Sequence, residues 1–127
     1  MAEETRKVLL VDDDEAFCTI MSALLIRHGF QVQVASAAEQ ALQLLRLDRP
    51  DIILTDIMMP EIDGLTLIRR IRSNPSGADI PTIVVSALVL ARERAAASQA
   101  GADAFLAKPF SFHELRTTIQ HVLAPIG

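Results

Sequence analysis

Five short apolar runs recur along the chain, separated by stretches of helical period, and this alternation most constrains the possible fold. The runs predict strands at Lys7 to Val11 (KVLLV), Gln31 to Ala35 (QVQVA), Ile52 to Thr55 (IILT), Thr82 to Ser86 (TIVVS) and Ala104 to Leu106 (AFL). Strands that alternate with helices predict a parallel sheet covered on both faces. QVQVA alternates as an edge strand does, whereas IILT and TIVV indicate central strands.

Capping residues and glycines predict where the intervening helices begin and end. We expect helices over Glu15 to His28 with Asp14 as N-cap, from a capping box at Ser36 to Glu39, over Leu65 to Arg72, over Ala91 to Ala100, and from a second box at Ser111 to Glu114. Gly29 and Gly101 suit helix ends. Pro60 and Gly64 fit a turn after the third strand, with Gly64 free to adopt positive φ.

Length and alternation together predict an α/β fold: a doubly wound, five-stranded parallel sheet of order 2-1-3-4-5, in a flavodoxin-like (βα)5 sandwich of three layers. The chain has 127 residues, half of them hydrophobic, which fits one domain over residues 1–127. Four residues follow the last predicted helix, so we expect any output domain to lie outside this chain.

Charge and cysteine content exclude several classes of function. The formal net charge is -4, and the densest basic stretch (Arg69, Arg70 and Arg72) falls in the last turn of a predicted helix, where cations suit the dipole. We therefore expect no direct contact with nucleic acid. Cys18 is the only cysteine, the N-terminus is acidic, and no apolar run approaches membrane-spanning length. We expect a cytoplasmic protein without membrane insertion.

Acidic residues gather where such a sheet binds ligands. For strand order 2-1-3-4-5, the ligand crevice lies beyond the carboxyl ends of the first and third strands. Asp12 and Asp13 follow the first strand, and Asp56 ends the third. These carboxylates would repel one another unless a cation neutralised them, and hard oxygen ligands suit Mg²⁺. Zinc is a poor fit because the three histidines are scattered over helices.

The fourth and fifth strands bring Ser86 and Lys108 to the same crevice. Lys108 lies inside an apolar run, AFLAKPF, and so needs an anionic partner. An ion pair with Asp56 satisfies it, and so does a phosphoryl group that Asp56 carries. Carboxylates act as nucleophiles when they form aspartyl-phosphates, and Lys108 and the Ser86 hydroxyl would then contact the phosphoryl oxygens.

These motifs resemble response-regulator receiver domains, the CheY-like phosphoacceptors of two-component systems, over essentially the whole chain. The matching features are the pair Asp12 and Asp13 after KVLLV, Asp56 in LTDIMMPEIDG, Ser86 in TIVVSA, and Lys108 with Pro109 in FLAKPF. Each motif alone is weak, but all four in register are specific.

The resemblance implies a signalling switch that catalyses only its own phosphorylation and dephosphorylation. Asp56 would accept phosphate from the phosphohistidine of a sensor histidine kinase or a histidine phosphotransfer protein. Mg²⁺ (or Mn²⁺) would bind to Asp13, Asp56 and the backbone carbonyl of Met58, with Asp12 helping through water. Lys108 would bond the phosphoryl group.

The resemblance also implies a switch surface. Ser86 would follow the phosphoryl group and Phe105 would turn inward, changing the face of the fourth helix, fifth strand and fifth helix that binds a downstream target. The bond between Lys108 and Pro109 is expected to be cis. Phe105 stands where the family often has tyrosine, and permanent burial as core packing is the alternative for it.

Met58 and Leu88, two residues beyond Asp56 and Ser86, resemble the positions that tune phosphate lifetime in this family. Both are apolar here. We expect them to exclude attacking water and to slow hydrolysis of the phosphoryl group.

Three other functions are compatible with parts of the pattern. A phosphatase of the haloacid dehalogenase type would want an acid two residues after Asp56, where Met58 stands. A flavin carrier of the flavodoxin type would want small hydroxyl and glycine residues after the first strand, where this chain has three aspartates. An interaction module that works without phosphorylation remains open, although the full set of acids, serine and lysine argues against it.

Overall fold

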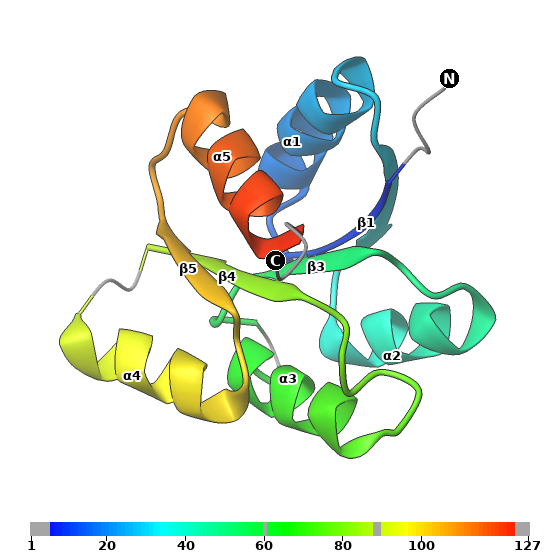
Figure 1. The fold of residues 1–127 in the computed structure, drawn as a ribbon, viewed down its shortest axis with the longest axis vertical. Helices are drawn as coiled ribbons and strands as arrows, with labels where there is room; N and C mark the ends of the chain where they lie inside the picture. Colours follow the sequence, from blue (N-terminus) through cyan, green and yellow to red (C-terminus); the bar gives the residue numbers. More distant parts are fainter. Residues whose placement is uncertain (1–5, 60, 88–89, 124–127) are drawn as a thin grey trace.

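Within residues 6–59, 61–87 and 90–123, which the computed structural model describes, five parallel strands form one sheet with five helices around it (Figure 1). The strands are β1 (Lys7–Val11), β2 (Gln31–Ala35), β3 (Ile52–Thr55), β4 (Thr82–Ser86) and β5 (Ala104–Ala107). The helices are α1 (Glu15–Arg27), α2 (Ala38–Leu47), α3 (Gly64–Ser73), α4 (Ala91–Ala100) and α5 (Phe112–Leu123). The strand order is β2-β1-β3-β4-β5, which confirms the predicted doubly wound, flavodoxin-like topology.

The helices divide between the two faces of the sheet. Figure 1 shows α1 and α5 on one face, and α2, α3 and α4 on the other. Each face has its own apolar core: Leu10, Leu25 and Leu115 belong to the α1 and α5 side, and Leu9 and Leu67 to the opposite side. Neighbouring residues of β1 thus enter different cores, as the period of two in a strand requires. Among the described helices, none is long and apolar enough to cross a membrane.

The strand predictions agree closely with the structure, because burial on both faces leaves a plain sequence pattern. Every residue of β3 and β4 is buried, as expected of central strands. β2 lies at an edge and exposes three of its five residues. β5 runs one residue further than predicted, to Ala107.

Most of the predicted helix ends are confirmed. Asp14 caps α1 by accepting a hydrogen bond from the Phe17 backbone N–H at 3.1 Å. The box at Ser111 is present, since the Ser111 N–H donates to Glu114 and the Glu114 N–H donates to the Ser111 hydroxyl, both at 3.1 Å. Gly29 adopts a φ of 93°, a conformation in which a side chain would be strained.

The capping box predicted at Ser36 is wrong. Ala37 is the N-cap of α2, and its side chain makes no capping hydrogen bond. The backbone N–H of Ser36 instead donates to the Gln40 side-chain carbonyl at 2.8 Å, and its hydroxyl lies 3.2 Å from the same oxygen. Glu39 pairs with Arg70 of α3 at 3.4 Å. Ser36 is therefore hydrogen-bonded to the Gln40 amide, and Glu39 is paired with Arg70. Neither residue makes the contacts of the expected capping box.

Gly64 is required for a different reason from the one its sequence position suggested. It is the first residue of α3 and does not use the positive φ that its place in a turn would have allowed. A Cβ at this position would lie 1.9 Å from the Asp56 carbonyl oxygen. The Gly64 N–H also donates to the Ile57 carbonyl at 2.8 Å. The helix start therefore packs directly on the backbone of Asp56, with no room for a side chain.

We expect Gly64→Ala to destabilise the fold by about 3 kcal/mol, because backbone atoms cannot move aside as a flexible side chain would. Gly29→Ala is the control: nothing lies within 4 Å of its Cβ, so it carries only the cost of a positive φ, about 1 kcal/mol. Urea unfolding followed by circular dichroism measures both, since the chain has no tryptophan or tyrosine. An equal loss in the two variants would contradict the steric argument.

Candidate functional site

The parallel register brings the predicted acids together at the carboxyl edge of the sheet. Val11 pairs with Thr55, so the next residues, Asp12 and Asp56, leave β1 and β3 side by side. The Asp56 N–H donates to the Val11 carbonyl at 3.0 Å, which continues the ladder by one step. Asp12 is only 2% exposed. A carboxylate at that depth requires partners.

Lys108 supplies a partner to both carboxylates. Its ammonium lies 2.9 Å from Asp12 Oδ2 and 3.3 Å from Asp56 Oδ2, and its side chain is 20% exposed. The sequence suggested a pair with Asp56, but the shorter contact is with the more buried Asp12. Burial lowers the pKa of Lys108, yet the hydrogen bond to Asp12 and the charges of Asp56 and Asp12 outweigh it, so the pKa is raised. Lys108 is therefore a cation at neutral pH.

The remaining oxygens of the two acids face backbone donors. Asp12 Oδ1 accepts from the Asp14 N–H at 3.0 Å, and Asp56 Oδ1 accepts from the Ile57 N–H at 2.6 Å. The Met58 N–H lies 3.4 Å from the same Asp56 oxygen. The loops after β1 and β3 therefore supply hydrogen-bond donors to the carboxylate oxygens that Lys108 does not contact.

Asp13 lies apart from this buried pair. It is exposed and lines an open hollow of about 530 Å³ together with Ile57, Met58, Met59 and Asp63. Over the described part of the chain, no three acidic, histidine or cysteine side chains are grouped closely enough to hold a metal ion. The donor chemistry nevertheless fits a hard divalent cation, because Mg²⁺ needs only one or two carboxylates and keeps several waters.

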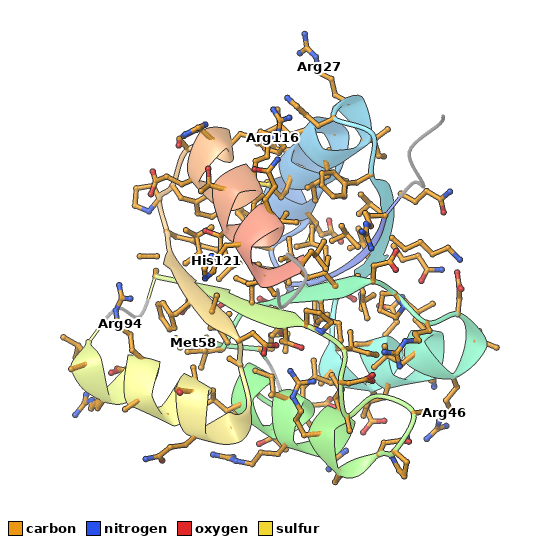
Figure 2. The ribbon with its side chains drawn as sticks, viewed as in Figure 1. Arg27, Arg46, Met58, Arg94, Arg116 and His121 are labelled. Atoms are coloured by element: carbon orange, nitrogen blue, oxygen red, sulfur yellow. The ribbon has the colours of Figure 1, made fainter. Side chains whose placement is uncertain are left out.

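Ser86 and Phe105 lie on β4 and β5, the next two strands of the sheet after β3. Ser86 is buried at the end of β4, and its carbonyl accepts the Lys108 N–H at 2.9 Å. Phe105 is partly buried and packs on the cluster that includes Val84. Figure 2 labels Arg94 near the start of α4. Its guanidinium lies 4.7 Å from the centre of the Phe105 ring. Phe105 therefore retains an exposed side in this structure and is not fully buried core.

The other predicted residues differ in how far the structure describes them. Met58 is 63% exposed beside Asp56, whereas Met59 packs partly into the core next to α3. The bond between Lys108 and Pro109 is cis, as expected. Leu88 lies outside the described residues.

One residue of the site was missed by the sequence reasoning. Phe17 of α1 lies under Lys108, whose ammonium is 4.1 Å from the centre of the phenyl ring. Phe17 also lines an apolar hollow of about 430 Å³ with Met21, Ala87, Pro109 and Phe110. Its spacing along α1 is that of an ordinary core position, so the pattern alone gave no sign of a contact with the lysine.

Comparison with known proteins agrees with this arrangement. A family model described as response regulator receiver domain matches residues 8–120. Response regulator MprA of Mycolicibacterium vanbaalenii is 39% identical over 117 residues, covering 92% of this chain and 50% of that protein. The chain thus spans about half the length of the curated relatives it matches.

Solved structures give the same result. Chemotaxis protein CheY4 of Vibrio cholerae superposes with a TM-score of 0.90 at 28% identity, covering 94% of this chain and 100% of that one. The receiver domain of sensor histidine kinase PA1611 from Pseudomonas aeruginosa, which has a magnesium ion coordinated in its active site cleft, gives a TM-score of 0.88 at 32% identity, covering 96% and 100%. The chain described here belongs to the response regulator receiver domain family of two-component systems.

Proposed function

We propose that this receiver takes a phosphoryl group onto Asp56 and thereby changes a partner-binding surface. The observation that carries the proposal is the Lys108 ammonium, held between Asp12 and Asp56 at the carboxyl ends of three strands. Such a cation lies where a phosphoryl group on Asp56 would carry its negative charge. Asp56 is 14% exposed, so it is still reachable from solvent.

In the proposed reaction, an Asp56 carboxylate oxygen attacks phosphorus and the bond to the donor breaks. The donor would be the phosphohistidine of a sensor histidine kinase or a histidine phosphotransfer protein, whose imidazole nitrogen leaves. Mg²⁺, held by Asp13, Asp56 and the Met58 carbonyl with help from Asp12, would neutralise charge on the transferring group when bound. The magnesium in the cleft of the Pseudomonas aeruginosa receiver supports this assignment by likeness.

The change in the partner-binding surface would follow from the negative charge that phosphorylation adds at Asp56. Lys108 and the Ser86 hydroxyl would contact the phosphoryl oxygens, and Phe105 would turn inward from its partly exposed position. The face formed by α4, β5 and α5 would then bind a downstream protein or an output domain outside the described chain. We place this exchange in the cytoplasm, without a direct role for nucleic acid. Local charge that biases a two-state surface is a common switching device.

Features of the site argue against the other functions. Asp12, Asp13 and Asp14 follow β1, where a flavin phosphate would be repelled. Met58 offers no general acid for a phosphatase with its own substrate. A module that works without phosphorylation would not need Lys108 to be shared by two carboxylates.

Phosphorylation is tested by intact mass after incubation with acetyl phosphate and Mg²⁺. We expect an adduct of about 80 Da, the mass of one phosphoryl group, that depends on Mg²⁺ and is absent in Asp56→Asn. Asp63→Asn is the matched control, because Asp63 lines the adjoining hollow and asparagine can still cap α3. An adduct that persists in Asp56→Asn, or that vanishes only in Asp63→Asn, would refute the assignment.

The lifetime of the phosphoryl group is expected to depend on Met58. Replacing this exposed apolar side chain by a polar one should admit water beside Asp56, so Met58→Asn should shorten the half-life about three- to tenfold, roughly 1 kcal/mol in the barrier. Leu88→Glu should act in the same direction. Decay of the adduct by mass measures both, with Met58→Leu as the apolar control. Half-lives in Met58→Asn that match the wild type would overturn this role.

A further inference from the structure

Phe17 contributes to the site although it carries no polar group. We propose that Phe17 is a positioning residue, whose ring holds the Lys108 ammonium against the carboxylates of Asp12 and Asp56. The ammonium is 4.1 Å from the ring centre, well inside the range of a cation–π contact. The negative face of the ring attracts the same ammonium that the two carboxylates contact.

A closed circuit of contacts fixes the position of the ring. The Phe17 N–H donates to Asp14 Oδ1 at 3.1 Å, and the Asp14 N–H donates to Asp12 Oδ1 at 3.0 Å. Lys108 completes the circuit by donating to Asp12 Oδ2 at 2.9 Å while lying over the Phe17 ring. The cap that starts α1 therefore also sets the distance between the ring and the acid.

The ring itself is held by a second aromatic residue. Phe110 meets Phe17 edge to face, with ring centres 6.3 Å apart and planes at 77°. Such T-shaped pairs are favourable because the positive edge of one ring meets the negative face of the other. Phe110 follows Lys108 by two residues, so the segment that carries the lysine also carries the support for its aromatic partner.

Lysine needs such support more than most residues. Its side chain has four carbons and many rotamers, and the two carboxylates contact only its tip. This role for Phe17 rests on the proposed function, because a lysine held in advance costs less ordering when it meets a phosphoryl oxygen. Without the ring, the ammonium would sample more orientations and phosphorylation would slow.

Fluorinated phenylalanine separates the electrostatic role of the ring from its packing role. Mono-, di- and trifluorinated phenylalanine, incorporated at position 17 alone, weaken the negative face of the ring at nearly constant shape. The first measurement is the NMR order parameter of the Lys108 side-chain nitrogen in the unphosphorylated protein. Lys7 and Lys108 are the only lysines, so Lys7, paired with Asp48, is an internal control in each spectrum.

We expect the Lys108 order parameter to fall stepwise with fluorination while that of Lys7 stays constant. Unchanged Lys108 values across the series would overturn the positioning role. This measurement requires no phosphate, so it decides the role of Phe17 even if Asp56 accepts none, a result that would refute only the proposed function.

The second measurement is the rate constant for phosphorylation by acetyl phosphate with Mg²⁺. We expect the rate constant to fall with each added fluorine, to fall about fivefold in Phe17→Leu, and to recover in Phe17→Tyr, since a cation–π contact of a partly exposed lysine is worth on the order of 1 kcal/mol. The same fluorinated residues at Phe30, which packs at the edge of the α1 and α5 core, should leave it unchanged. Equal rates across the Phe17 series would contradict the proposal.

Discussion

The ammonium of Lys108 is the one charge on which the carboxyl edge of this sheet depends. Asp12 is almost completely buried, and Lys108 is the cation that contacts it. Removing one partner of a buried pair typically costs about 3–5 kcal/mol, because the other charge is left without compensation. The register aligns Val11 of β1 and Thr55 of β3 with Phe105 of β5, which runs two residues further before Lys108 follows it. The register of the sheet therefore determines which charged side chains meet at the site.

The charges of the site do not balance, and this imbalance suits the proposed chemistry. Two carboxylates share one ammonium, which leaves one negative charge uncompensated in the buried pair, and Asp13 adds another on the open side. A divalent cation would offset both. A phosphoryl group on Asp56 would replace the charge of that carboxylate with a larger one further out, so Lys108 would then have a stronger partner than Asp12. In the proposed reaction the site would thus favour different contacts of Lys108 with and without phosphate.

The sequence predicted those elements whose burial produces a recognisable local pattern of apolar residues. The bounds of β3 and β4 were predicted to the residue, because every side chain in them is buried. The local pattern was insufficient where tertiary contacts decide: Glu39 pairs with Arg70 instead of closing a capping box, and the close packing of Gly64 on Asp56 left no sign in the sequence. Phe17 was missed because a helical aromatic residue facing a lysine has the same spacing as one facing the core.

β5 and the residue after it take part in one cation–π contact on each face of the sheet. Successive residues of a strand point to opposite faces. Phe105 accordingly packs on the α4 side beneath Arg94, whereas Leu106 belongs to the core of α1 and α5, the side on which Lys108 meets Phe17. Phe105 lies three residues before Lys108, a span of roughly 10 Å in extended chain. If a phosphoryl group draws Lys108 away from Asp12, the chain between Lys108 and Phe105 would be displaced with it. In the proposed switch, β5 would therefore carry Phe105 at the output surface and, directly after its last residue, Lys108 at the phosphoryl group.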